Sequence, residues 1–359
     1  MEILKKIIEF CSDVVWNTPE AFPLMVLLLL GTGVFLTVRL RFVQLRRFWH
    51  SIGALAGKYD NPEDHGDVSH FQALSAALSA TVGIGNIAGV ATAIHYGGPG
   101  ALFWMWVTGF IGMAAKFTEC TLSLKYRKVH KDGSVSGGPM YYIEKGMGSK
   151  WKWMAIVFAV CTAISSFGSG NAVQAFTMAD SFRTDFGIPP WISGLVSASL
   201  VGIVIIGGIR RIGAVASKLV PVMAVLYVGS AALVVFMNVA HLPEALATIV
   251  SSAFTPQAEI SGFAGSGFIF MLTWGVKRGL FSNEAGQGSA PIAHAAAKTE
   301  EHVREGSVAL MGPFIDTMVI CTMTGLIIVL TGTWSNRFAD RVNLSAQSDL
   351  TFLAANSTV

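Results

Sequence analysis

Residues 81–89 read TVGIGNIAG, and they lie inside residues 68–115, a stretch that contains no Asp, Glu, Lys or Arg. A helix needs about 20 mainly apolar residues to cross the hydrocarbon core of a membrane, so this stretch is long enough for two helices. The sequence GGPG at residues 97–100 separates them. Three glycines and one asparagine weaken the first helix near its middle. Irregular backbone at membrane depth is tolerated only inside protein or beside water, so residues 81–89 predict an interrupted membrane helix.

The composition of the whole chain is that of a membrane protein. Of its 359 residues 52% are apolar and only 13% are charged, and the mean hydropathy is +0.56. Soluble domains carry about 25% charged residues. The net charge of +3 does not suggest a nucleic-acid partner, and the four cysteines have neither CxxC nor metal-ligand spacing. We therefore expect an integral membrane protein surrounded by lipid.

Apolar runs predict eight spans within one transmembrane domain that covers residues 1–359. The spans are residues 21–38, 68–96, 101–124, 153–179, 189–209, 219–240, 260–297 and 308–332. The tail at residues 333–359 is polar and cannot span. Because isolated strands cannot satisfy their backbone groups in lipid, the expected fold class is an all-α helical bundle.

Basic residues alternate between the connections of these spans. From the first connection to the last, the number of Lys and Arg residues is 5, 0, 7, 1, 3, 0 and 2. Connections rich in Lys and Arg face the cytoplasm, so the odd-numbered ones are predicted inside and the N-terminus outside. The chain is thus expected to be a multi-pass protein of the cell inner membrane.

The seventh span is also interrupted, because residues 274–291 read WGVKRGLFSNEAGQGSAP. The two interrupted spans are five apart, so they should cross the membrane in opposite directions. Matching interruptions in two inverted halves are typical of transporter binding sites. The alternative is that the glycines only permit close helix packing. Residues 83–88 also fit a dinucleotide-binding GxGxxA pattern, but an uncharged membrane stretch lacks the strand that this pattern requires.

These stretches resemble the alanine or glycine:cation symporter family, the sodium:alanine symporters. The matching residues are 66–74, 81–89, 97–106, 137–142, 274–291 and 314–317. The resemblance implies a leucine-transporter-type bundle of two inverted five-helix repeats behind an extra N-terminal helix. It also implies symport of alanine or glycine with sodium. Family members look like eleven-helix proteins, so we interpret this chain as a C-terminally truncated member whose second repeat is incomplete.

A zwitterionic substrate needs an anion side and a cation side. The half-helix that begins near Ile84 offers free N–H groups and a positive dipole end for the carboxylate. Freed carbonyls near Thr81 suit a cation or the ammonium group, which Ser282 can also bind. Trp274 is the expected size filter, or alternatively a packing residue, and Gln174 either faces the substrate or joins helices. The predicted substrate-binding residues are Thr81, Gly83, Ile84, Gly85, Asn86, Gln174, Trp274, Ser282 and Asn283.

Sodium prefers hard oxygen ligands. The predicted sodium ligands are Ser79, Thr81, Val82 and Asn86. The resemblance implies that a ninth helix completes a site near Ser79 and Val82. Several charges lie at membrane depth and need partners. We expect Glu284 and Asp316 to be the counter-ions of Lys277 and Arg278, and Lys116 to pair with Glu119 three residues later.

Functions of other classes remain as alternatives. An intramembrane enzyme would need a catalytic constellation at depth, and His70, His95 and His294 have no catalytic partner nearby in the sequence. A channel would rarely need two interrupted helices in inverted positions. A partial transporter that needs further C-terminal helices is the alternative that the span count raises.

Overall fold

The computed structural model describes residues 23–61, 63–255 and 267–334, besides a few single positions before residue 20. The described chain is a helical bundle with one antiparallel hairpin of β1 (Lys128–Val129) and β2 (Val135–Ser136). By length and composition, four of the described helices can cross a membrane, or five if a bent pair is one span. Two shorter apolar helices accompany them. Residues 260–266 of the seventh predicted span and 335–359 of the predicted tail lie outside the described residues.

The first half of the described chain contains the following helices. They are α2 (Leu24–Arg39), α3 (Val43–Arg46), α4 (Phe48–Leu55), α5 (His70–Thr81), η1 (Gly85–Gly89), α6 (Val90–Gly97), α7 (Gly100–Tyr126), α8 (Pro139–Met147), η2 (Ser149–Trp151), α9 (Lys152–Phe167), η3 (Gly168–Ala172) and α10 (Val173–Phe186).

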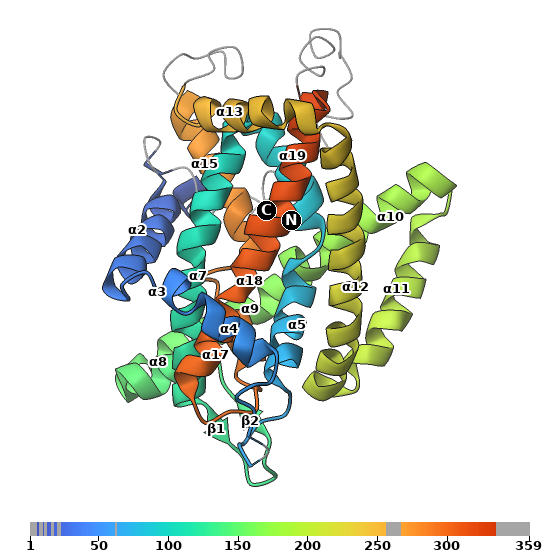
Figure 1. Ribbon diagram of the computed structural model, residues 1–359. Coiled ribbons are helices and arrows are strands. Elements are labelled where there is room, and N and C mark those ends of the chain that lie inside the picture. The colour runs from blue at the N-terminus through green and yellow to red at the C-terminus, as the bar shows by residue number, and fades with distance from the viewer. Residues whose placement is uncertain are drawn as a thin grey trace.

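The second half begins with α11, and its last helices follow one another without a loop. The bounds are α11 (Pro190–Ile205), α12 (Gly208–Met237), η4 (Val239–His241), α13 (Leu242–Ser252), α15 (Gly267–Asn283), α16 (Ala290–His294), α17 (His302–Ala309), α18 (Met311–Pro313), η5 (Phe314–Cys321) and α19 (Thr322–Leu330). In Figure 1, α13 lies across the upper end, while α8, α17 and the hairpin lie at the lower end.

Local sequence explains where several helices begin. Ser69 and Gln72 form a reciprocal capping box at the start of α5, in which each side chain accepts a hydrogen bond from the other residue's backbone N–H.

The sixth predicted span begins at residue 219, but α12 begins at Gly208 and so contains the basic residues that were expected in a connection. One of them, Arg210, binds the carboxylate of Asp67 at 2.9 Å. A helix can therefore extend beyond its apolar part, which hydropathy alone does not reveal.

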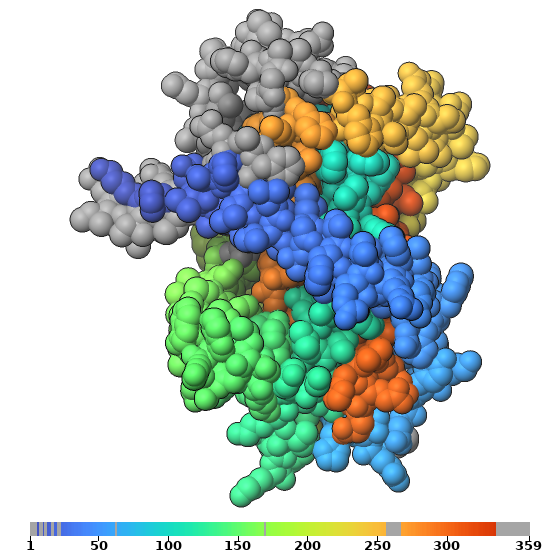
Figure 2. Space-filling model, turned by 90° about the vertical axis from the view of Figure 1, so that its left-hand side faces the viewer, coloured from blue at the N-terminus to red at the C-terminus, as the bar shows by residue number. Residues whose placement is uncertain are grey.

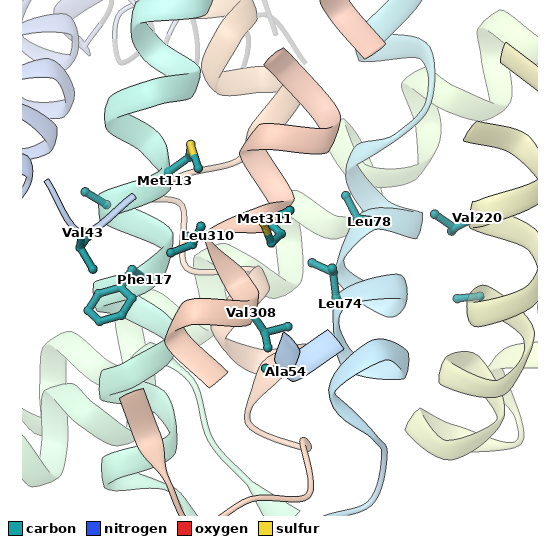
Figure 3. Packing of buried hydrophobic residues seen from close by; sticks show 12 residues of the cluster. Val43, Ala54, Leu74, Leu78, Met113, Phe117, Val220, Val308, Leu310 and Met311 are labelled. Atoms are coloured by element: carbon teal, nitrogen blue, oxygen red, sulfur yellow. The ribbon is translucent and has the colours of Figure 1, made fainter. Parts of the chain in front are cut away.

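The core of the lower half joins segments that are far apart in the chain. Figure 3 shows side chains of α5, α7, α17 and α18 converging there, and the buried members include Leu74, Leu78, Met113, Phe117, Leu310 and Met311. A second buried cluster in the upper half joins α6, α7, α13, α15 and α19. In Figure 2, the blue segment from α2 to α4 runs across this face of the bundle. Val26 of α2 packs against α15 in a third cluster.

The first predicted interruption is confirmed. Residues 70–81 and 85–97 form two helices that meet at an angle of 57°. This broken helix runs antiparallel to α15: Gly97 lies against Met271 and Gly85 against Ser282. The two broken helices therefore pair along their length in opposite directions.

The second interruption is shorter than predicted. The sequence placed irregular backbone from Trp274 onward, but α15 stays helical to Asn283, and the non-helical segment is residues 284–289. The glycines of α15 serve helix packing instead: a Cβ on Gly275 would lie 2.6 Å from the carbonyl oxygen of Ala101 on α7. Residues 284–289 follow the end of α15. Their first residue, Glu284, has a positive backbone φ, which is incompatible with a continuing right-handed helix.

Candidate functional site

The first break exposes backbone N–H groups that side-chain oxygens occupy. The Gly83 N–H donates to Asn86 Oδ1 at 2.8 Å, and the Ile84 N–H donates to Gln174 Oε1 at 3.3 Å. A Cβ on Gly83 would lie 2.6 Å from Gln174 Oε1, so glycine permits this close approach. The structure therefore brings Gln174 of α10 to the break, where the N–H groups can bind an anion when the amide withdraws.

A buried polar cluster lies directly behind this break. Asn86 Nδ2 is 2.5 Å from Asp316 Oδ1 and 3.2 Å from Ser282 Oγ. The Ser282 hydroxyl donates to Asp316 Oδ2 at 2.6 Å, and the Thr317 hydroxyl lies 3.2 Å from the same oxygen. Asp316 and Ser282 are both fully buried. Residues from the two broken helices and from η5 thus meet at one carboxylate.

The backbone around this cluster departs from the α-helix. Asn86 lies in η1 and Asp316 in η5, and both segments are π-helical. A third π-helical segment, η3, ends two residues before Gln174. π-Helical turns inside α-helices frequently occur at functional sites, because the extra residue redirects side chains. The contact between η1 and η5 at Asn86 and Asp316 supports this position as the site.

Within the described ranges, no basic side chain is in direct contact with Asp316. Among the described residues, no Lys, Arg or His nitrogen lies within 4.0 Å of its carboxylate. Its hydrogen-bond partners are an amide and two hydroxyl groups, which are neutral. A buried carboxylate with neutral donors is costly, so the arrangement favours binding of a cation, an ammonium group or a proton.

The predicted sodium ligands do not gather at one point of the structure. Ser79 lies on the exposed side of α5, where its hydroxyl donates to the Ala76 carbonyl at 2.7 Å. Thr81 Oγ1 lies 3.5 Å from the Leu78 carbonyl of its own helix. Val82 packs against the lower core. Only Asn86 of the four belongs to the buried cluster around Asp316.

The predicted size filter lies elsewhere than expected. Trp274 stacks on Tyr96 of α6, with ring centroids 4.6 Å apart. Residue 281 is seven positions further along α15, or about 10 Å along the helix axis. It is Phe281, not Trp274, that lies against the break, since a Cβ on Gly85 would be 3.2 Å from its ring. The sequence placed Trp274 at a break, whereas in the structure it lies within α15.

The predicted charge pairs are also different. In the described ranges, no ion pair within 4.0 Å joins Lys277 or Arg278 to Glu284 or Asp316. The Arg278 guanidinium lies over the Trp274 ring at 5.2 Å. Glu284 accepts a short hydrogen bond from Ser289 within the non-helical segment. The acidic groups are therefore occupied by neutral donors that no charge pattern in the sequence indicates.

Asn283 and Glu119 hold the second break. Asn283 Oδ1 accepts from the Ala285 N–H at 2.9 Å, and its Nδ2 donates to Thr317 Oγ1 at 3.2 Å. Glu119 accepts from the Gly286 N–H at 3.5 Å. The predicted pairing of Lys116 with Glu119 is confirmed at 4.0 Å. Asn283 is thus used within the protein, whereas it was expected to bind the ammonium group.

Residues 1–357 match the family described as the sodium:alanine symporter family. The chain belongs to the sodium:alanine symporter family. It is 47% identical over 321 residues to the sodium/alanine symporter AgcS of Methanococcus maripaludis, covering 88% of this chain and 70% of that one. It is 41% identical to YrbD of Bacillus subtilis, a putative sodium/proton-dependent alanine carrier protein, over 92% of this chain and 65% of that one. It is also 40% identical to the probable sodium/glutamine symporter GlnT of Bacillus subtilis, over 91% of this chain and 66% of that one.

This member of the symporter family contains site residues that the sequence did not suggest. The Thr324 hydroxyl of α19 donates to the Asn86 carbonyl at 2.7 Å, and the Tyr227 hydroxyl lies 2.6 Å from Thr324 Oγ1. Cys321 Sγ lies 3.1 Å from Ser282 Oγ. The available signal was the spacing of Asp316 and Thr324, which lie eight residues apart, an interval found on one face of a helix, within a mainly apolar span.

A second group that the sequence did not suggest is fully buried near the lower end. His70 Nδ1 and His294 Nδ1 each contact one carboxylate oxygen of Glu305, the second at 2.5 Å. The sequence offered these two histidines no catalytic partner nearby, and in the structure both share Glu305 of α17. This carboxylate is 235 residues away from His70, so only the fold brings the groups together.

Proposed function

We propose that this symporter-family chain binds a small neutral amino acid together with Na⁺ and moves both across the cell inner membrane by alternating access. The substrate carboxylate binds at the N–H groups of Gly83 and Ile84. The cation binds at Asp316, between the two broken helices. The pairing of two antiparallel broken helices supports a leucine-transporter-type arrangement of inverted repeats.

The buried carboxylate of Asp316 is the observation that carries this proposal. A zwitterionic amino acid brings no net charge, so one carboxylate balances one monovalent cation. Na⁺ takes oxygen ligands, and the oxygens of Ser282 and Thr317 lie beside the Asp316 carboxylate. Turning the Asn86 amide by half a rotation would present its oxygen to the ion as well.

The aromatic ring of Phe281 supports a small substrate. It lies against Gly85 at the break, where the substrate side chain would follow from a carboxylate held at Ile84. The relatives are named for alanine and for glutamine, so the family name alone does not fix the side-chain size. We propose alanine and glycine as substrates on the basis of this wall.

The basic residues of the lower end support the proposed orientation. Lys128, the C-terminal residues of α8 and the basic start of α12 lie at the end of the bundle that carries the hairpin. Because basic residues favour the cytoplasmic side, their position at this lower end supports the proposal that it faces the cytoplasm and that the N-terminus is outside.

Binding of radiolabelled alanine to the purified chain tests the proposal. We expect saturable binding in NaCl, much weaker binding in choline chloride, and loss of the sodium dependence in Asp316→Asn. Asp185→Asn is the matched control, because Asp185 lies exposed near the end of α10. Equal alanine affinity with and without sodium, or an unchanged sodium dependence in Asp316→Asn, would contradict the assignment of Asp316.

A further inference from the structure

The buried cluster of His70, His294 and Glu305 has no part in the proposed binding site. His70 is the first residue of α5, the lower half of the first broken helix. His294 is the last residue of α16, the lower half of the second broken helix. Glu305 lies on α17, and all three side chains are buried. One carboxylate therefore joins the inner ends of both broken helices.

Both histidines of this cluster contact Glu305 directly. The described residues contain no group of three or more His, Cys, Asp or Glu side chains with the arrangement of a metal site. Each oxygen of Glu305 is used by a different imidazole, and both imidazoles use Nδ1. If α5 moves away from α16, the carboxylate must release one of the two, which would leave a buried polar group without its partner.

Backbone contacts beside the cluster show that this end is closed. The Asp67 N–H donates to the Ala296 carbonyl at 2.8 Å, and the Lys298 N–H donates to the Val68 carbonyl at 2.8 Å. A Cβ on Gly66 would lie 2.4 Å from Lys298 Cα, so only glycine fits.

Arg127 adds a second tie at the same end. Its guanidinium donates to four backbone carbonyl oxygens, at 2.7–3.1 Å, which belong to His65, Ala295, Ala297 and Thr299. The segment before α5 is thus bound to the segment after α16.

The charges around His70 favour one added proton. Its Nε2 faces Asp60 Oδ1 at 3.7 Å, on the opposite side of the ring from Glu305. A protonated His70 would therefore lie between two carboxylates. Arg304 of α17 opposes this proton at longer range, while it binds Glu301 at 2.6 Å and the Tyr59 carbonyl. Of the other elements packed here, α16 contributes His294, which shares Glu305 with His70.

We propose that Glu305 is a positioning residue of the transport cycle, which holds the inner ends of both broken helices together, and that a proton on His70 strengthens this joint. The inference rests on the proposed alternating access, because only a bundle that opens at this end needs a joint that can separate. The labelling test described below needs no substrate. It can therefore contradict the joint even if the purified chain binds alanine, and it can support the joint even if alanine binding is absent.

Cys120 is a native reporter for opening of this joint. It is buried on α7 against Ala290 and Ala309, with Ala77 of α5 beside it. Cys161 of α9 is exposed. The ratio of N-ethylmaleimide labelling at Cys120 to that at Cys161, measured by peptide mass spectrometry on the purified chain, reports opening and corrects for reagent reactivity.

His70→Gln should raise this labelling ratio about tenfold, as expected when one charge-assisted hydrogen bond is lost, and Glu305→Ala, which removes both histidine contacts, should raise it at least as much. Their double variant should show no further increase, because both changes separate the same joint. Glu305→Gln keeps one acceptor oxygen and should lie between these variants and the wild type. His302→Gln, three residues earlier on the same helix, should behave as the wild type. Size-exclusion profiles and melting temperatures identify any variant that is unfolded. The labelling ratios of the folded variants then decide whether the joint exists.

A pH series distinguishes a joint that depends on a proton on His70 from contacts that depend on packing alone. The labelling ratio of the wild type should rise from about pH 6 to about pH 8, across the usual range of histidine titration. In His70→Gln the ratio should be high and independent of pH. A wild-type ratio that falls or stays constant over this range would remove the proton from the proposal. A ratio within twofold of the wild type in folded Glu305→Ala or His70→Gln would overturn the joint itself.

Discussion

Thr324 connects the outer layer of the bundle to the proposed cation site, and replacing it with valine tests whether this connection supports binding. Its hydroxyl donates to the Asn86 carbonyl at 2.7 Å and lies 2.6 Å from the Tyr227 hydroxyl. Valine has nearly the same shape but no hydroxyl group. The substitution therefore removes both hydrogen bonds and leaves the packing in place.

The size of the effect follows from these two bonds. A neutral hydrogen bond contributes about 1 kcal/mol, and a buried acceptor left without a partner costs about 1–3 kcal/mol. Asn86 also contacts Asp316, so a displaced Asn86 backbone changes the geometry of the cation site. If about 1 kcal/mol of this loss falls on the bound state, the sodium affinity of Thr324→Val should be about fivefold weaker.

Sodium titration of alanine binding to the purified chain measures this change. Thr324→Ser keeps the hydroxyl and should restore most of the affinity. Thr331→Val is the control, because Thr331 is exposed on the turn after α19 and its hydroxyl bonds to the Ile327 carbonyl. If Thr324→Val binds sodium as tightly as the wild type, the reasoning that Thr324 positions Asn86 is wrong.

Two further predictions concern packing and selectivity. Gly275→Ala should lower the melting temperature by an amount that corresponds to about 1–3 kcal/mol, because its Cβ would lie 2.6 Å from both the Ala101 carbonyl and Trp104 Cβ. Gly168→Ala, where a Cβ meets no atom within 4 Å, should change it far less in the same thermal scan. Phe281→Ala should allow leucine to compete with alanine for binding, while Trp274→Ala should keep the preference for small side chains. The opposite result in the competition assay would return the size filter to Trp274.

Local features of the sequence predicted the framework of the fold. Uncharged runs indicated the helices, and the glycines of residues 81–89 indicated the break between α5 and η1. The same reasoning failed at residues 274–283, because Gly275 and Gly279 lie against α7 and leave the helix intact. A glycine at a break and a glycine at a helix contact look alike in one sequence, and only the neighbouring helix distinguishes them.

The partners of the site residues could not be predicted in the same way. A carboxyl group in an apolar span is costly, so the sequence correctly marked Asp316 as a residue in need of partners. It paired Asp316 with Lys277 and Arg278 because these charges were also expected at membrane depth. The structure gives it Asn86, which is 230 residues away, and Ser282. Pairing across such distances follows from how the helices pack, which no local pattern contains.

The contrast between two buried carboxylates gives the strongest reason to assign a ligand to one of them. Glu305 and Asp316 lie on one continuous helical run from α17 to η5, and both are fully buried. The two oxygens of Glu305 are each bound by an imidazole of the protein, and such groups can supply a positive charge themselves. In the described part of the chain the oxygens of Asp316 are bound by an amide and hydroxyl groups, which cannot. Under the proposed function a bound cation balances the charge of Asp316, whereas the charge at Glu305 can change with a proton on its own histidines. This difference is the physical basis for assigning cation binding to the site behind the break and closure to the inner end.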